Sequence, residues 1–244
     1  MTGVAEKLLR ARTSTVLIEL TTRCNLRCVY CAVNHPDYEA RDLGLDPVEI
    51  VRAVAALRPR EVQISGHGES TIVAGWHELA RELLALGCPL TITTNLARRL
   101  SDEEVQVLSE FDAITVSCDT ADAETYALLR RGGRLERLVD NLRRLARACE
   151  EHPERRPYLA VNCVLTERSL GQIEGLVDWA ADHGVACVSL TNLVVHPALA
   201  SMSPGRPAGV AGARDAVERA RARAHARGLD FNVMGGLREA LWRA

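Results

Sequence analysis

The sequence contains little lysine, almost no net charge and no long apolar run, and these shortages exclude several classes of protein. Lys7 is the only lysine among 30 basic residues, and we attribute this bias toward arginine to GC-rich coding. A formal net charge of -2 creates no long-range field that would attract a polyanion. We therefore do not expect nucleic acid as a partner.

Signals for membrane insertion and for export are also missing. No run of about eighteen apolar residues is present, so we expect no transmembrane helix and no membrane partner. Residues Met1–Arg12 carry charges at Glu6, Lys7 and Arg10 instead of the apolar core of a signal peptide. These features predict a cytoplasmic protein. Since the cytosol keeps thiols reduced, the eight cysteines indicate a metal or catalytic site rather than a disulfide framework.

Short β-type segments alternate with helical segments along the chain. The expected strands are Val16–Leu20, Glu61–Ser65, Leu90–Thr94, Ala113–Ser117, Tyr158–Leu165 and Cys187–Asn192. Such alternation favours parallel strands joined by helical crossovers. Six units, where a complete barrel has eight, predict an α/β fold in the form of a partial (β/α)6 barrel. We expect a single domain over residues 1–244, with a core of about 14–228 and a C-terminal tail at 229–244.

Helix starts are marked by capping residues. Asp46 precedes Pro47, which predicts an N-cap followed by proline at the first helical position. Ser101–Glu104 and Ser169–Gln172 both read as capping boxes, and the second is expected to open a helix that runs to about Asp182. Further helices are expected near Trp76–Leu86, Leu135–Cys149 and Arg214–Arg227.

Three cysteines, Cys24, Cys28 and Cys31, lie close together in the segment LIELTTRCNLRCVYCAVNHP. Their spacing places them on one face of a helix, so three small core residues are one interpretation. The segment follows a predicted strand and is rich in polar residues that suit a loop, which counts against this interpretation. His35 follows Cys31 by four positions, so a closed Cys3His zinc site in a binding module is a second interpretation.

An iron–sulfur cluster is the third interpretation and the one that we favour. A [4Fe–4S] cluster has four irons, each normally held by one thiolate. Three cysteines leave one iron open to a small molecule, and an open coordination position is typical of a catalytic metal site. The number of cysteines therefore predicts a cluster whose fourth corner accepts a ligand.

The run Cys24-Asn-Leu-Arg-Cys28-Val-Tyr-Cys31 resembles the cluster motif of the radical S-adenosylmethionine (radical SAM) enzymes. Its place after the first strand also agrees with that family, and the resemblance extends over roughly Val16–Asn192. It implies one [4Fe–4S] cluster held by the three cysteines and S-adenosylmethionine (SAM) as the second cofactor. It also places Tyr30 among the cofactor-binding residues.

A second motif, SGHGES at Ser65–Ser70, follows the second predicted strand. Gly66 and Gly68 allow the backbone to approach a ligand closely, although an ordinary strand-to-helix turn also suits this pattern. The motif resembles the family's glycine–glutamate motif, which implies that Glu69 makes a charge-assisted pair with the methionine ammonium of SAM. The sequence departs from the common form at His67, between the glycines, and at Ser70, where proline is usual.

Polar residues also stand at the ends of the other predicted strands. Ligands of parallel α/β folds bind at the carboxyl ends of strands, where Asn95 is expected to lie. The resemblance implies that Ser117 and Asn162 contact the ribose or carboxylate of SAM. It further implies that Arg130 or Arg131 reaches the carboxylate. Each of these residues also suits a simpler role as a turn cap or a solvated helix end.

The remaining cysteines show no ligand spacing. Those interpreted as small apolar core residues are Cys88, Cys149, Cys163 and Cys187. Because Cys187 is the last cysteine, we expect no auxiliary clusters of the kind that many relatives carry near the C-terminus. Cys118 directly follows the fourth predicted strand, and we consider it a hydrogen-atom donor to a substrate radical, as in epimerases of the family.

The resemblance implies that the reduced cluster cleaves SAM to a 5′-deoxyadenosyl radical, which abstracts a hydrogen atom from a substrate. We expect a small-molecule substrate that undergoes dehydrogenation, epimerisation or elimination, and a reductant such as flavodoxin or ferredoxin. Activation of a glycyl-radical enzyme and peptide modification are alternatives, and the zinc module is an alternative of another class. The loops Asn34–Gly44 and Ser201–Gly212 are expected to be mobile and to close over the site.

Overall fold

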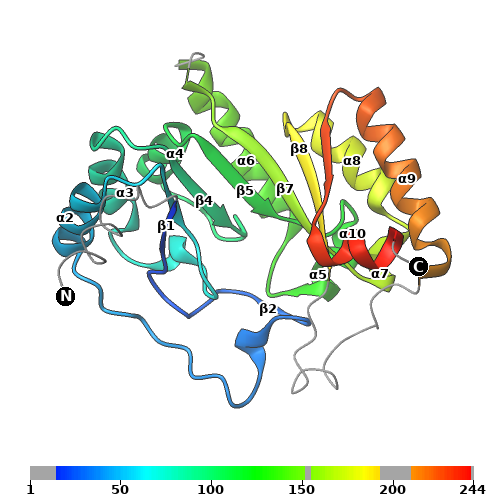
Figure 1. Ribbon diagram of the computed structural model, residues 1–244, viewed down its shortest axis with the longest axis horizontal. Coiled ribbons are helices and arrows are strands. Elements are labelled where there is room, and N and C mark those ends of the chain that lie inside the picture. The colour runs from blue at the N-terminus through cyan, green and yellow to red at the C-terminus, as the bar shows by residue number, and fades with distance from the viewer. Residues whose placement is uncertain (1–14, 152–154, 193–209, 243–244) are drawn as a thin grey trace, which may run out of the picture.

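A computed structural model describes residues 15–151, 155–192 and 210–242, and its centre is a seven-stranded sheet (Figure 1). In spatial order the strands are β1 (Thr15–Ile18), β3 (Glu61–Ile64), β4 (Leu90–Thr94), β5 (Ala113–Ser117), β7 (Tyr158–Leu165), β8 (Cys187–Asn192) and β9 (Asp230–Val233). Each strand pairs in parallel with its neighbour. The predicted parallel α/β partial barrel is therefore confirmed.

The sheet has one strand more than expected. Asp230–Val233 pairs in parallel with β8, and the helix after it, α10 (Gly235–Trp242), also contacts β8. Leu237 and Leu241 of this helix belong to the hydrophobic core. Residues 229–242 are therefore part of the folded core rather than a tail.

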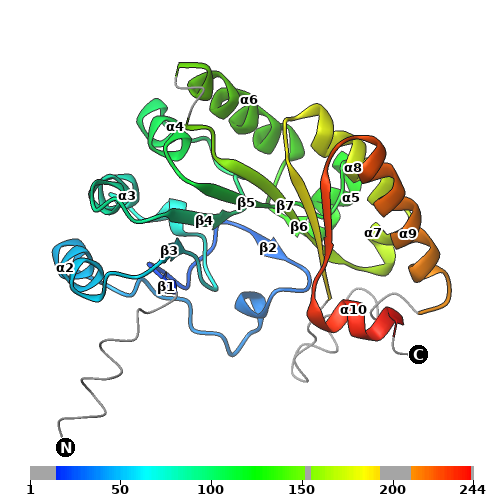
Figure 2. The same ribbon diagram turned by 45° about the horizontal axis from the view of Figure 1, so that its top comes forward.

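Helices surround the outer face of the sheet, which curves into a half-barrel in Figure 2. The larger helices are α2 (Pro47–Leu57), α3 (Trp76–Ala85), α4 (Asp102–Ser109), α6 (Leu135–Glu151), α8 (Ile173–Asp182) and α9 (Val210–Ala226). The shorter elements are β2 (Arg27–Cys28), η1 (Ala32–Asn34), η2 (Ser70–Ile72), α5 (Ala123–Leu129), β6 (Arg130–Arg131) and α7 (Glu167–Leu170). Among the described helices, none has the length and apolar character that a bilayer-spanning segment needs.

Two of the three predicted helix caps are confirmed. The Asp46 side chain accepts a hydrogen bond from Val48 N, and Ser101 forms a reciprocal capping box with Glu104. The prediction at Ser169 is wrong, because Ser169 is the third residue of α7 and Thr166 is its N-cap. The chain turns into this short helix directly after β7, so the cap falls at the strand end, and α8 begins only at Ile173.

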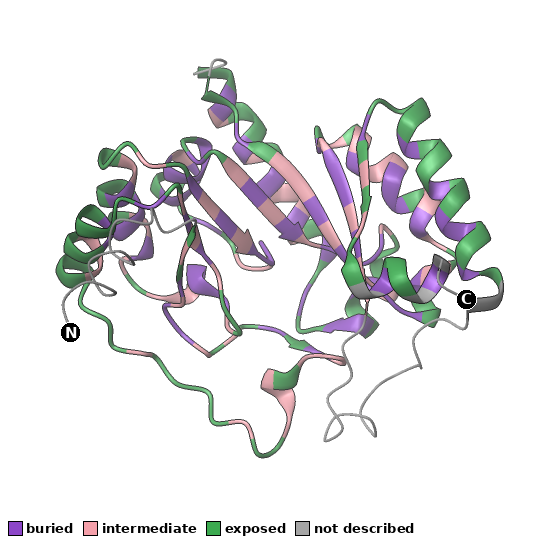
Figure 3. Ribbon diagram, in the orientation of Figure 1, coloured by how far each residue is buried: buried purple, intermediate pink, exposed green. Residues whose placement is uncertain are grey.

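The two faces of the sheet differ in chemistry. On the helix-covered face, residues such as Ile64, Ile92 and Ile114 are fully buried. Figure 3 shows that buried residues alternate along these strands with residues of intermediate exposure. The partly exposed residues of the concave face include Gln63, Thr91, Thr93, Thr115, Ser117, Asn162 and Ser189. A parallel sheet is usually apolar on both faces because both are covered, so a polar concave face indicates a surface open to a ligand.

A buried amide fixes the loop that follows β4. Asn141 of α6 is 1% exposed, and its Nδ2 donates hydrogen bonds to Leu96 O at 2.9 Å and to Arg98 O at 2.6 Å. Its Oδ1 accepts a longer hydrogen bond, of 3.4 Å, from Leu100 N. Leu96 has a positive φ of 47°, so the loop needs these bonds to keep a conformation that a branched residue disfavours. Asn141 thereby sets the path of the chain next to Asn95.

We predict that Asn141→Ala lowers the free energy of unfolding by about 2 to 4 kcal/mol, because it leaves buried backbone groups without partners. The control is Glu150→Ala on the exposed side of the same helix, which is expected to change this free energy by less than about 0.5 kcal/mol. Urea denaturation followed by circular dichroism measures both values. Equal stability of the two variants would contradict the role assigned to Asn141.

Candidate functional site

The cysteine segment is a loop that follows β1, interrupted only by the two-residue strand β2 and the single turn η1. The helical interpretation of the cysteine spacing is therefore wrong. All three thiols are free of disulfides, with Cys28 buried and Cys24 and Cys31 partly exposed. Leu26 N lies 3.4 Å and Asn95 Nδ2 lies 3.7 Å from Cys24 Sγ, and both donate toward the sulfur. Such donors stabilise a metal-bound thiolate and tune the potential of a cluster.

The arrangement of the three thiols bears on the zinc interpretation. Over residues 15–151, 155–192 and 210–242, no group of three or more His, Cys, Asp and Glu side chains is arranged to hold one metal ion. His35 Nδ1 accepts a hydrogen bond from Asp37 N at 3.2 Å, so this ring nitrogen is engaged locally. Soft thiolate donors suit both zinc and iron–sulfur clusters, so the donor type alone does not choose between them.

The pKa values of Cys28 and Cys24 indicate that both thiols carry a proton in the metal-free chain. Burial raises the pKa of the Cys28 thiol to about 12, and burial also raises the pKa of Cys24. In the metal-free chain both thiols are therefore protonated at neutral pH. A cluster that bound at these residues would therefore release their protons.

A two-stranded ribbon holds Cys28 in place. Residues of β2 and β6 pair antiparallel, with Cys28 opposite Arg130 and Arg27 opposite Arg131. The pairing extends through a hydrogen bond of 2.9 Å from Val29 N to Leu129 O. The loop of residues 19–31 carries the three cysteines and is named the cluster loop. It is thus joined to β6, about one hundred residues later and directly after α5.

A buried carboxylate, Asp119, anchors this ribbon to the sheet. Asp119 is 0% exposed and follows β5. Its Oδ2 accepts a hydrogen bond of 2.5 Å from the Tyr30 hydroxyl, and its Oδ1 accepts bonds from Arg130 Nη2 at 2.9 Å and Val164 N at 3.0 Å. The Arg130 guanidinium also lies 5.9 Å from the centre of the Tyr30 ring. One side chain therefore connects the cluster loop, β6, β5 and β7.

The charges in this network support one another. Burial raises the pKa of Tyr30, so its hydroxyl stays protonated and donates. Burial disfavours the charge of Arg130, but the neighbouring Asp119 carboxylate keeps the pKa of Arg130 above its ordinary value. Asp119 and Arg130 thus balance each other's charge, whereas removal of one partner would leave an isolated buried charge.

Tyr30, Arg130 and Arg131 are predicted cofactor-binding residues, and the structure places them differently. The polar ends of Tyr30 and Arg130 contact Asp119, and Arg131 is exposed on the other face of the ribbon. Their contacts with SAM stay predictions. Asp119 was not among the predicted site residues. Its position just after the strand Ala113–Ser117 and eleven residues before Arg130 was a signal that could have indicated it.

The loop with the glycine–glutamate motif packs against the cluster loop. A Cβ at Gly68 would lie 2.3 Å from Arg23 O and 2.4 Å from Thr21 O, so the close approach of two backbones requires glycine here. Glu69 N donates a hydrogen bond of 2.8 Å to Arg23 O. At Gly66, a Cβ would meet the Glu19 side chain, which accepts hydrogen bonds from the exposed His67.

Glu69 is a buried carboxylate that binds only neutral donors. Its side chain is buried, and Oε1 accepts hydrogen bonds from Thr71 N at 3.2 Å, Thr71 Oγ1 at 2.8 Å and Thr94 Oγ1 at 2.7 Å. Its Oε2 accepts one from Asn95 N at 2.7 Å. In the described part of the chain it forms no ion pair. A buried anion without a protein cation fits a ligand that brings a positive charge.

Asn95 joins the two loops. Its backbone binds Glu69, and its Nδ2 donates to Asn25 Oδ1 at 2.9 Å and toward Cys24 Sγ. The structure therefore brings together three of the residues predicted from sequence: Cys24, Glu69 and Asn95. They come from the ends of β1, β3 and β4, as expected for a parallel sheet.

Ser117 and Asn162 lie opposite each other on β5 and β7, on the partly exposed concave face. The same row continues through Ser189 of β8 and Asn232 of β9, which pair with Asn162 and with each other in register. Ser189 and Asn232 were not predicted from the sequence. For Ser189, the alternation of apolar and polar residues in Cys187–Asn192 was a usable signal.

The structure contradicts the predicted role of Cys118. Neighbouring residues at a strand end point to opposite faces, and Ser117 takes the open one. Cys118 is 0% exposed, lies in the hydrophobic core and donates from Sγ to Thr120 O at 3.2 Å. A thiol in this position does not face a substrate on the concave side. The interpretation as core residues is confirmed for Cys149, Cys163 and Cys187, which are buried and free of disulfides. It is wrong for Cys88, which is only partly buried and packs against the outside of the core.

The two predicted lids have different outcomes. Residues 35–44 form a loop that is tied to the cluster loop by hydrogen bonds from Thr22 N to Arg41 O and from Thr21 Oγ1 to Asp42 Oδ1. Their mobility stays a prediction. Residues 201–209 lie outside the described residues, and α9 already begins at Val210.

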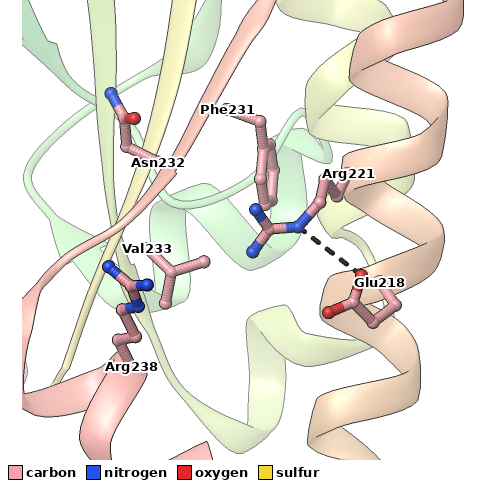
Figure 4. A pocket seen from close by; sticks show the side chains of 6 residues that line it. All are labelled: Glu218, Arg221, Phe231, Asn232, Val233 and Arg238. Carbon is pink, nitrogen blue, oxygen red and sulfur yellow. Dashed lines mark ion pairs between the residues drawn. The ribbon is translucent and has the colours of Figure 1, made fainter. Parts of the chain in front are cut away.

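A separate cavity of about 590 Å³ lies between α9, β9 and α10, at the edge of the sheet that is farthest from β1 (Figure 4). Arg221 lies 3.5 Å from Glu218 and 5.7 Å from the ring centre of Phe231 in its wall. Asn232, at the end of the polar row, also lines this cavity, whereas none of the cysteines does.

Comparison with known proteins agrees with this geometry. The family model of the radical SAM superfamily matches residues 18–153, more than half of the chain. A tungsten-containing aldehyde ferredoxin oxidoreductase cofactor-modifying protein of Pyrococcus furiosus is 26% identical over 72% of this chain and 51% of its own length. A GTP 3′,8-cyclase of Rhodococcus opacus is 30% identical over 69% of this chain and 48% of its own length. The chain thus spans about half the length of these curated relatives.

The fold also has close structural neighbours. Streptococcus suis SuiB, solved with bound S-adenosylmethionine, has a TM-score of 0.76 and 22% identity over 97% of this chain and 55% of SuiB. The family match, the cysteine loop and the shared fold lead to one conclusion. The chain is a member of the radical SAM superfamily, whose cofactors are a [4Fe–4S] cluster and S-adenosylmethionine.

Proposed function

We propose that Cys24, Cys28 and Cys31 hold one [4Fe–4S] cluster, that SAM binds beside it, and that the protein modifies a polar small molecule. The observation that carries this proposal is the buried Glu69 carboxylate. It lacks a cation among the described residues and is connected through Asn95 to Cys24. When bound, the two cofactors supply the reductive cleavage of SAM and the abstraction of a hydrogen atom from the substrate.

The residues of this chain hold and orient the cofactors. Glu69 attracts the ammonium group of SAM, and the donors Thr71, Thr94 and Asn95 fix its carboxylate so that little reorganisation accompanies binding. Gly68 lets the two loops touch, which sets the distance between Glu69 and the cysteines. Asp119 keeps the ribbon that carries Cys28 against the sheet.

The concave face supports a polar, uncharged substrate. Ser117, Asn162, Ser189 and Asn232 form one row across four strands, and each offers a hydroxyl or an amide. Such groups discriminate strongly when a substrate covers them, since an analogue without the matching group leaves them unpaired. We assign Ser117 and Asn162 to the ribose or carboxylate of SAM. Ser117 lies two residues before Asp119, which anchors the cysteine loop, and Asn162 pairs with Ser117. Ser189 and Asn232 are then left for the substrate.

The position of Cys118 bears on the type of reaction. Epimerisation requires that a hydrogen atom be returned to the substrate radical, and Cys118 is buried away from the concave face. Dehydrogenation and elimination need no such donor. We therefore favour dehydrogenation or elimination of the small molecule.

A peptide is the second candidate substrate. The concave face is open along the polar row, and the fold neighbour SuiB has also been solved with the precursor peptide SuiA bound. Incubation of the reconstituted protein with unlabelled SAM and a library of deuterated small molecules and deuterated peptides separates the two classes of substrate. Transfer of deuterium into 5′-deoxyadenosine identifies the molecule that loses a hydrogen atom.

We predict that the anaerobically reconstituted protein, reduced with dithionite, releases 5′-deoxyadenosine from SAM. Cys24→Ala, Cys28→Ala and Cys31→Ala are each expected to reduce this release at least about a hundredfold, because each removes one cluster ligand. Cys88→Ala is the control, since Cys88 is a free cysteine outside the cluster loop. Chromatography of the quenched reaction measures the product. Release that survives in the three variants would refute the proposed function.

We also predict that Glu69→Gln weakens SAM binding about tenfold to a hundredfold while the cluster's visible absorbance stays unchanged. The amide keeps the shape of the side chain but loses the charge that attracts the ammonium group, and bonds to charged groups contribute about 1.5 to 3 kcal/mol. Glu61→Gln, at the other end of the strand that precedes Glu69, is the matched control and is expected to bind SAM normally. Isothermal titration with SAM gives both dissociation constants. If Glu69→Gln loses the cluster instead, Glu69 has a structural role and not the one assigned here.

A further inference from the structure

The β2–β6 ribbon has two faces with different chemistry. In each strand the two residues point to opposite sides, so Cys28 and Arg130 share one face and Arg27 and Arg131 share the other. Cys28 and Arg130 are both buried, whereas Arg27 and Arg131 are both exposed. Only the thickness of this ribbon therefore separates a cluster ligand from the solvent.

The exposed face carries two like charges directly opposite each other. Such a pair on neighbouring strands is destabilising in an isolated protein. Within the residues that the structure describes, neither guanidinium takes part in an ion pair or a side-chain hydrogen bond. Two nearby arginines do, since Arg23 lies 3.0 Å from Asp42 and Arg134 lies 3.9 Å from Glu136. Among the described residues, no carboxylate forms an ion pair with Arg27 or Arg131.

An unfavourable pair of charges becomes favourable when an anionic surface covers it. The place of this pair, directly outside Cys28, suits a partner that must bring an electron close to the cluster. Figure 2 shows β2 and β6 near the open side of the half-barrel. Arg27 and Arg131 are both exposed, so a partner can contact both side chains.

We propose that the outer face of the β2–β6 ribbon is the docking surface for an acidic one-electron carrier protein, with Arg27 and Arg131 as its main contacts. This inference rests on the proposed function, because it requires the cluster on Cys28. With a flavin carrier, the anionic hydroquinone gives up one electron and becomes the neutral semiquinone. The cluster accepts that electron and passes from the 2+ to the 1+ state, so no proton is transferred.

The test uses the reconstituted protein and a flavodoxin in the hydroquinone state, mixed anaerobically in a stopped-flow instrument. The loss of the cluster's visible absorbance gives the rate of reduction. The double variant Arg27→Gln/Arg131→Gln is expected to be reduced at least about tenfold more slowly at low ionic strength and to depend less on salt. The double variant Arg60→Gln/Arg81→Gln removes the same charge from exposed positions elsewhere and is expected to match the wild type.

Two further measurements separate docking from other effects. Arg27→Lys/Arg131→Lys keeps the charges and is expected to keep the wild-type rate, and reduction by dithionite, which needs no docking, is expected to be equal in all variants. The inference is overturned if the glutamine variant keeps its rate with flavodoxin, if it loses the dithionite reaction equally, or if the lysine variant is as slow as the glutamine variant. A wild-type protein that dithionite cannot reduce would instead overturn the proposed function, and this inference with it.

Discussion

Asp119, fully buried at the end of β5, binds the Tyr30 hydroxyl, the Arg130 guanidinium and the Val164 amide at the same time. Through these three bonds the loop that carries the cysteines is attached to the central strands. The attachment depends on charge balance, because neither Asp119 nor Arg130 tolerates burial without the other. The position of Cys28, and the ribbon that presents Arg27 and Arg131 to solvent, follow from this one pair.

A parallel sheet supplies the second constraint, because it collects the carboxyl ends of its strands at one edge. Glu69 follows β3 and Asn95 follows β4, so they meet beside Cys24 although they are far apart in sequence. The same strands separate an apolar face, which the helices cover, from a polar concave face that stays open. The residues that we propose to hold the cofactors therefore lie beside an open polar face. Such a scaffold allows relatives with the same core to act on different molecules.

Local signals in the sequence were sufficient for much of this arrangement. The six strands with clear β-type runs, the caps at Asp46 and Ser101, and the cysteine triplet each depend on residues within one short segment. The features that were missed depend on contacts between distant segments. Asp119 is important only because Tyr30 and Arg130 reach it. The burial of Cys118 in the core depends on the register of β5. The short strand β9 is recognised only by its pairing with β8. The cap at Ser169 failed because Thr166, nearer the end of β7, takes that role.

The central claim is that three cysteines hold the cluster and leave its fourth iron to SAM. Electron–nuclear double resonance of the reduced, reconstituted protein tests it most directly, with SAM that carries ¹⁵N in its methionine amino group. The account predicts a ¹⁵N coupling to the cluster that appears only when labelled SAM is present. A coupling from a protein nitrogen that persists with and without SAM, or a purified protein that contains one zinc per chain and assembles no cluster, would contradict the account.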